Sequence, residues 1–207
     1  MSVGRRVRAQ PSDGWLAEGC GITLPPFLGW SDPHVVVDIA ADAESAGWDG
    51  VFLWDHVTWN PAWGGTPPMA DPWMCLAAAA TATFRVLLGT VVTSLPRRRP
   101  QIVARQVVTL DHLSGGRAVL GVGIGEDFEY QAYGEPVQAR GARLDEGLEI
   151  VTRLLSVDKC GSCTPSTDGS RRIHVVRKSP TICGCSPVAA GFRLACHRGV
   201  MLVLLLV

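Results

Sequence analysis

The chain has 207 residues, which is enough for one sizeable core, and 47% of them are hydrophobic. Its 19 basic side chains balance 19 acidic ones, so the totals argue against a polyanion-binding class and against an intrinsically disordered one. Residues 157–207 nevertheless hold only two acidic but seven basic side chains, and five of the seven cysteines. We therefore divide the chain into an extension (1–19), a body (20–156) and a tail (157–207).

Membrane and secretion signals are not evident in the sequence. The basic start MSVGRRVRAQ lacks the apolar stretch of a secretory signal, and no segment reaches the roughly twenty apolar residues of a membrane span. The apolar run 200–207 is about a third of that length, so we expect a buried strand or an aggregation-prone end there rather than an anchor. We expect a cytoplasmic protein with no membrane partner.

Four short apolar runs follow one another through the body, at 20–24, 50–54, 86–92 and 117–122. Their spacing is roughly 30 to 36 residues. Because their hydrophobicity is continuous rather than alternating, they indicate strands that are covered on both faces, as in parallel sheets. A crossover helix fits between each pair, so the body is predicted to consist of repeated βα units.

The helix boundaries support this interpretation. Asp32 is expected to cap a helix that has Pro33 at its first position, and Asp71 precedes a second helix in the same way. A third helix is predicted from Pro100, and a fourth over 139–155, where leucines and a valine form one stripe. Four such units belong either to a doubly wound sheet or to half of an eight-unit barrel, and periodicity alone does not choose.

Both folds place function at the carboxyl ends of the strands, and Asp55-His56 follows the second strand directly. A histidine there can exchange protons near neutral pH. The alternative is that His56 caps a loop or bonds a backbone carbonyl. Without further context, the sequence leaves both roles open.

The glycine-rich stretch GVGIGE follows the fourth strand, where its backbone could approach a flat or phosphorylated ligand closely. It is not the dinucleotide fingerprint, because that pattern requires glycine at the position of Glu126. A close-packed turn from strand to loop explains it equally well.

The run Arg97-Arg98-Arg99 lies ahead of the third helix, where cations oppose the helix dipole. It indicates either an anionic ligand or a solvated loop. A nucleic-acid partner is not expected, because the body is net acidic and has no basic stripe interleaved with aromatic residues.

The tail cysteines raise the question of zinc, since Cys160 and Cys163 have a common ligand spacing. The remaining C-x-C pair is less usual and one cysteine is left over, so we expect no metal site. The composition of the tail also fits a segment read in a shifted frame.

Four segments in this order resemble the luciferase-like flavin-dependent oxidoreductases: AESAGWDGVFLWDHV, GTVVTSLPRRRP, LDHLSGGRAVLGVGIGE and RGARLDEGLEIV. The resemblance covers 21–155 and includes the subgroup similar to methylenetetrahydromethanopterin reductases. It implies an α/β fold of the (β/α)8 TIM-barrel type, with FMN or the deazaflavin coenzyme F420 across its mouth. It also implies oxidation or reduction of a small organic substrate, in many members as a monooxygenase.

The resemblance carries specific residues with it. It implies that His56 transfers protons or contacts the cofactor, with Asp55 beside it, and that Glu126 acts in acid/base chemistry. It implies further cofactor contacts along the third strand, where members bulge and often have a cis peptide bond, and at the turn after the fourth strand. These further contacts are Val91, Val92, Gly123, Ile124 and Gly125.

The tail departs from the family, because the residues after 155 match nothing in its pattern. About four βα units are therefore present, and the resemblance implies an incomplete barrel with an open sheet edge. An alternative to the enzyme is a truncated, catalytically inactive fragment. Such a fragment would function only by association, for instance as a homo-oligomer through that edge, or not at all.

Overall fold

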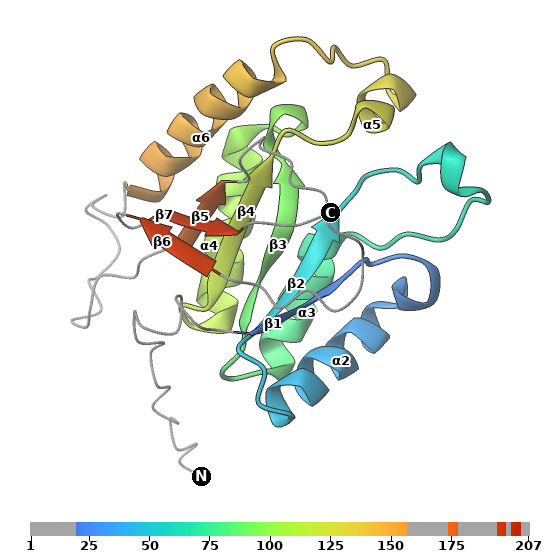
Figure 1. Cartoon of the computed structure of the whole chain (residues 1–207). Helices are drawn as coiled ribbons and strands as arrows, with labels where there is room; N and C mark the ends of the chain where they lie inside the picture. The colour runs from blue at the N-terminus through green and yellow to red at the C-terminus, as the bar shows by residue number, and fades with distance from the viewer. Residues whose placement is uncertain (1–19, 157–173, 178–193, 198–199, 204–207) are drawn as a thin grey trace.

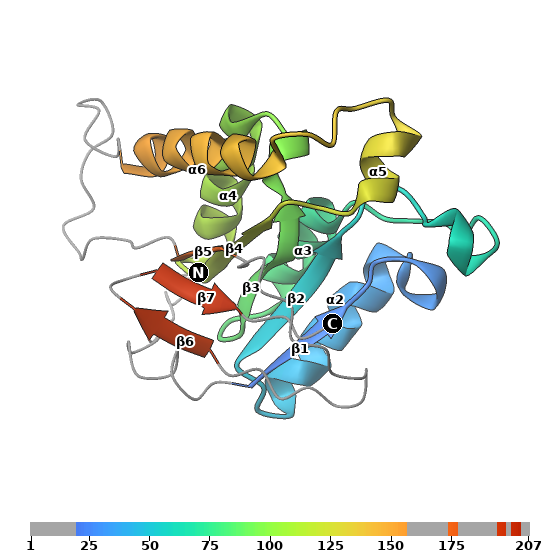
Figure 2. The same cartoon turned by 45° about the horizontal axis from the view of Figure 1, so that its top comes forward.

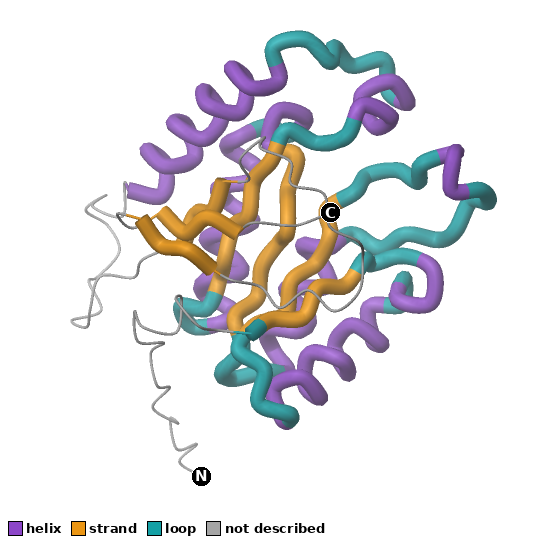
Figure 3. Tube along the Cα trace, viewed as in Figure 1, coloured by secondary structure: helices purple, strands orange, loops and turns teal. Residues whose placement is uncertain are grey.

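The computed structural model describes residues 20–156, 174–177, 194–197 and 200–203. Its centre is a parallel sheet in which five strands follow the order β1-β2-β3-β4-β5, shown in orange in Figure 3. The strands are β1 (Gly21–Leu24), β2 (Gly50–Asp55), β3 (Leu87–Ser94), β4 (Ala118–Gly123) and β5 (His174–Arg177). The four strands predicted in the body are confirmed, each within two residues at either end.

Long helices connect the strands, and the predicted boundaries hold. They are α2 (Pro33–Ser45), α3 (Pro72–Ala82), α4 (Pro100–Ser114) and α6 (Arg140–Ser156). Asp32 caps α2 by accepting a hydrogen bond from the N–H of His34, and Asp71 caps α3 by accepting one from Met74. Each carboxylate satisfies a donor that the first helical turn leaves free, and the proline that follows needs none.

Shorter elements lie in the connections. They are the 3-10 turns η1 (Leu28–Trp30), η2 (Pro61–Trp63) and η3 (Leu95–Arg97), and the six-residue helix α5 (Asp127–Ala132). The sequence did not predict α5. The side chain of its N-cap residue, Glu126, makes no capping hydrogen bond, so the usual start signal is absent.

The main core lies between one face of the sheet and the helices (Figures 1 and 2). Val51 and Leu53 of β2, and Leu88 of β3, pack there against Val36 of α2 and Val103 of α4. These residues alternate along each strand with side chains that face the other side of the sheet. β2, β3 and β4 are thus buried on both faces, as their continuous hydrophobicity predicted, whereas β1 is half-buried.

Glu44 ties α2 to the start of β3. Its carboxylate accepts hydrogen bonds from the backbone N–H groups of Phe84, Arg85 and Val86. Burial alone would raise the pKa of Glu44, but these donors and the charge of Arg117 hold it below the usual value. The turn between α3 and β3 is therefore held by an ionised carboxylate.

Three strands come from the tail. Residues 174–177 form β5, which pairs in parallel with β4, so the edge of β4 that we expected to be open is occupied. The antiparallel hairpin of β6 (Leu194–His197) and β7 (Val200–Val203) lies beside β5, and β7 contacts it (Figure 2). The strand expected in 200–207 is thus confirmed for 200–203. The cysteine pairs at 160–163 and 183–185 lie outside the described residues.

The described helices include none that is both long and apolar enough to cross a membrane.

Candidate functional site

The carboxyl ends of β2, β3 and β4 meet at one edge of the sheet (Figure 1). Asp55 pairs with Thr93, and Ser94 pairs with Gly123, so these neighbouring strands end at the same level. Residues that follow these strands therefore gather in one place, as they do in parallel α/β folds generally.

Asp55 is buried, and both of its carboxylate oxygens accept hydrogen bonds from the protein. The hydroxyl of Thr93 donates over 2.7 Å and the indole N–H of Trp73 over 3.2 Å to Oδ2, while Arg98 donates over 2.6 Å to Oδ1. Because Trp73 lies on α3, Asp55 joins the sheet to the helical layer. A cofactor contact for Asp55 stays a prediction.

The triple arginine is largely part of this framework. Arg98 pairs with Asp55, and the guanidinium of Arg97 lies 3.1 Å from Glu135 and 3.4 Å from Glu129. The side chain of Arg97 is only 7% exposed, so it is neither a solvated loop residue nor free for an external anion. Arg99 is exposed, as the loop interpretation expected for all three.

Four aromatic rings surround His56, and we call them the aromatic enclosure: Phe27, Trp54, Trp63 and Phe128. Their centroids lie 6.4, 5.8, 6.3 and 5.9 Å from that of the imidazole. The rings come from four segments, namely the loop after β1, the end of β2, η2 and α5. His56 therefore lies at the strand ends in apolar surroundings, and its side chain is 19% exposed to solvent.

Glu129 provides the ionic partner of His56. Its Oε1 lies 3.4 Å from His56 Nδ1, and it accepts a hydrogen bond of 2.9 Å from the N–H of Val57. Burial alone would raise the pKa of Glu129, but His56, the Val57 N–H and Arg97 together hold it below the usual value. The site thus combines an imidazole with a buried carboxylate.

The sequence analysis selected a different glutamate. Glu126 is exposed at the start of α5, and its predicted role in acid/base chemistry is not tested by this arrangement. Glu129 lies one turn further on and is 1% exposed. The local pattern does not single it out, because the neighbouring Phe128 and Tyr130 project about 100° to either side of it on a helix.

The third strand has the irregular backbone that the resemblance implied. The peptide bond between Val91 and Val92 is cis, and the register with β4 shifts between Thr90 and Thr93. Val91 is buried and Val92 is half-buried. The contact of either residue with a cofactor stays a prediction.

The turn after β4 is packed closely against β3. Gly125 has φ +74°, and a Cβ there would lie 2.2 Å from Ser94 Oγ, so only glycine fits. The carbonyl of Ile124 accepts a hydrogen bond of 2.6 Å from the hydroxyl of Tyr130, which lies on α5. The glycines therefore serve close packing, and Gly123 to Gly125 remain predicted cofactor contacts.

Two buried polar atoms of the sheet have no hydrogen-bond partner, Trp54 Nε1 and Thr23 Oγ1. Val51 and Leu53 face the helices, so Trp54 and Phe52 point to the opposite, inner face by strand alternation. Thr23 pairs with Phe52 and shares that face. A flat heterocycle with ring carbonyls, such as the isoalloxazine of FMN or the deazaflavin ring of F420, would suit these donors and the aromatic enclosure.

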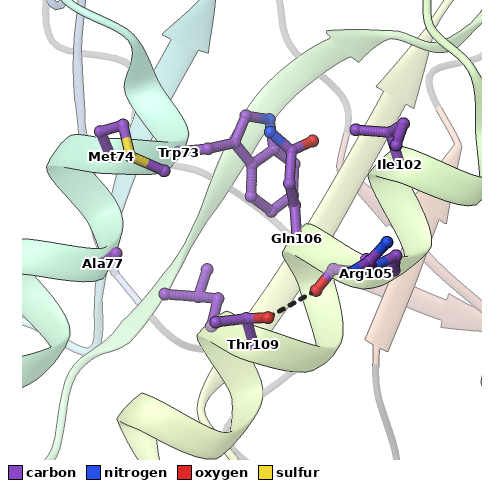
Figure 4. Close-up of a pocket in the computed structure, with 8 residues that line it drawn as sticks. Trp73, Met74, Ala77, Ile102, Arg105, Gln106 and Thr109 are labelled. Carbon is purple, nitrogen blue, oxygen red and sulfur yellow. Dashed lines mark hydrogen bonds between the residues drawn. The ribbon is translucent and has the colours of Figure 1, made fainter.

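A pocket of about 270 Å³ lies elsewhere, between α3 and α4 (Figure 4). Trp73, Met74, Ile102 and Gln106 line it, and Arg105 is its one charged lining residue. The pocket lies in the helical layer, and Trp73 connects it to Asp55 by the hydrogen bond described above. Among the described residues, no three His, Cys, Asp or Glu side chains are grouped to hold a metal ion.

Two of the proteins that resemble this chain are F420-dependent enzymes. An F420-dependent glucose-6-phosphate dehydrogenase of Beutenbergia cavernae is 44% identical over 117 residues, which are 54% of this chain and 34% of that protein. An F420-dependent secondary alcohol dehydrogenase, solved with an F420-acetone adduct, superposes with a TM-score of 0.64 and 24% identity, over 78% of this chain and 52% of that one.

The same fold occurs in an FMN complex. The oxygenating constituent of 3,6-diketocamphane monooxygenase from Pseudomonas putida superposes with a TM-score of 0.60 and 19% identity, over 79% of this chain and 52% of that one. The chain thus spans about a third to a half of the length of these relatives. It has four parallel βα units that correspond to about half of a luciferase-like barrel.

The sequence model of the luciferase-like monooxygenases matches residues 14–206. The parallel sheet and the relatives above agree with this match. The chain therefore belongs to the luciferase-like monooxygenase family.

Proposed function

We propose that the chain is a flavin- or deazaflavin-dependent oxidoreductase that acts on a small organic substrate at the carboxyl ends of β2, β3 and β4. The observation that carries this proposal is His56, an acid/base group held between aromatic rings and a buried carboxylate at the strand ends. Its relatives include an F420-dependent dehydrogenase, and a monooxygenase with the same fold was solved with FMN.

The cofactor would rest against the inner face of the sheet. Trp54 Nε1 and Thr23 Oγ1 would donate hydrogen bonds to its ring, and Val91 and Val92 would back it. When bound, such a cofactor supplies hydride transfer or oxygen activation. The protein contributes orientation, exclusion of water by the aromatic enclosure, and a proton.

His56 exchanges that proton with the substrate through the ring nitrogen that faces away from Glu129. Glu129 remains an anion and stabilises the protonated imidazole after each transfer, since opposite charges attract strongly where water is excluded.

Binding of the cofactor tests the proposal directly. FMN and F420 are titrated separately into the purified chain, and absorbance and fluorescence are followed while gel filtration confirms that the chain is folded. We expect saturable binding of one of them. A folded chain that saturates with neither would refute the proposal.

A pair of tryptophan variants locates the binding site. Trp54→Phe removes the unpartnered Nε1 donor and keeps an aromatic ring, so we expect weaker binding by about five- to tenfold. Trp48→Phe is the matched control, because Trp48 is 40% exposed and precedes β2 at its opposite end. Equal losses in both variants would place the ring elsewhere.

A further inference from the structure

Three groups converge on one oxygen of Glu129. The N–H of Val57 donates to Oε1 over 2.9 Å, and both Arg97 Nη1 and His56 Nδ1 lie 3.4 Å from it. The side chain of Glu129 is 1% exposed. This carboxylate is therefore fixed in place by groups other than the histidine, which is the property required of a residue that orients its neighbour.

The charge of Glu129 decides whether Nδ1 of the neutral His56 imidazole is protonated. An ionised carboxylate can only accept hydrogen bonds, so a neutral imidazole that faces it must present N–H. Nδ1 is buried and makes no hydrogen bond of ordinary geometry, so the Glu129 oxygen 3.4 Å away is the acceptor that faces it. The distance of 3.4 Å is longer than a strong hydrogen bond, and such contacts commonly tighten when a catalytic site is loaded.

Other elements that pack against His56 offer no competing charge. Phe27, Trp54 and Trp63 present aromatic rings from the loop after β1, from β2 and from η2, and Phe128 presents one from α5. Within the described part of the chain, Glu129 is thus the charged side chain that faces the imidazole, and Arg97 contacts Glu129 in turn.

We propose that Glu129 is the positioning residue of His56: it holds the proton on Nδ1 and leaves Nε2 as the nitrogen that exchanges protons with the substrate. The catalytic consequence rests on the proposed function, whereas the tautomer is a property of the chain itself. Because Nδ1 is buried, the 19% exposure of the His56 side chain belongs to its other atoms.

Nitrogen NMR of the chain tests this without cofactor. The ring nitrogens of the five histidines are labelled with 15N, and the signals of His56 are assigned by their loss in His56→Gln. Spectra are recorded at alkaline pH, where an imidazole is neutral. We expect Nδ1 to show the shift of a protonated nitrogen and Nε2 that of an unprotonated one. The reverse assignment in the wild-type chain would overturn the proposal.

Two matched variants identify the cause. Glu129→Gln replaces a charged acceptor by a neutral one, and charge-assisted hydrogen bonds are roughly twice as strong, so the ratio of Nδ1–H to Nε2–H should fall by about fivefold. Glu126→Gln makes the same change three residues earlier at an exposed position and should leave the ratio unchanged. An unchanged ratio in a folded Glu129→Gln chain would also overturn the proposal.

The two proposals fail separately. A chain that binds FMN or F420 but carries its His56 proton on Nε2 keeps the proposed function and loses the positioning role. A chain with the Nδ1–H tautomer that binds neither cofactor keeps the positioning geometry and loses the function.

Discussion

Asp55 joins β2 to β3, to α3 and to Arg98, which follows η3, and its replacement by asparagine should destabilise the fold. Asparagine keeps the shape but offers one acceptor oxygen in place of two, so its amide N–H2 must face either Arg98 or the pair of Thr93 and Trp73. Loss of a buried charged hydrogen bond costs about 1.5–3 kcal/mol, and an unsatisfied buried donor adds about 1 kcal/mol more. We expect Asp55→Asn to lower the free energy of unfolding by about 2–4 kcal/mol.

Urea unfolding followed by tryptophan fluorescence measures this loss. With a slope of about 2 kcal/mol per molar urea, the midpoint should fall by about 1–2 M. Asp38→Asn is the matched control, because Asp38 is exposed on α2 and should change stability by less than about 0.5 kcal/mol. If the midpoint of Asp55→Asn moves no further than that of Asp38→Asn, the three hydrogen bonds do not stabilise the fold and the reasoning is wrong.

Three further predictions concern the packing of the sheet. The pKa of Glu44 is lowered on folding, so its contribution to the free energy of unfolding is present above the unfolded pKa of about 4.3 and is lost as the pH falls through the folded pKa. Glu44→Gln should therefore lower the free energy of unfolding by about 1–3 kcal/mol in urea at pH 7. The difference from wild type should shrink in acid. Gly121→Ala places a Cβ 2.2 Å from the carbonyl oxygen of Thr90, so thermal unfolding should show a loss of about 2–3 kcal/mol, whereas Gly29→Ala, with nothing within 4 Å, should be nearly neutral. Tyr130→Phe leaves a carbonyl of the β4–α5 turn without its donor and should lower stability by about 1–2 kcal/mol in urea unfolding; no change would mean that water replaces the hydroxyl.

Much of the body could be predicted because its signals are local. A continuous apolar run indicates a doubly covered strand, and an Asp-Pro pair supplies both the cap and the first position of a helix. The structure has α2 and α3 beginning at the prolines that follow Asp32 and Asp71. The short helix α5 was missed because it has no capping side chain and covers only six residues.

The site could be predicted only in part. His56 follows β2 directly, so its place at the strand ends required nothing beyond the strand itself. Its partner Glu129 is 73 residues further along the chain, and the choice between Glu126 and Glu129 depends on which side of α5 faces the sheet. The fold brings the buried Glu129 to the histidine, and the acid/base role of Glu126 stays a prediction.

The sequence by itself therefore determined the βα units, their helix starts and the position of His56, because each is decided by residues close together in the chain. Only the tertiary structure decided which carboxylate faces the imidazole, why Arg97 and Arg98 are present, and which strand covers the edge of β4. The physical reason is that hydrogen bonds and ion pairs between distant segments depend on how helices pack on a sheet, and the spacing of residues along the chain does not contain that geometry.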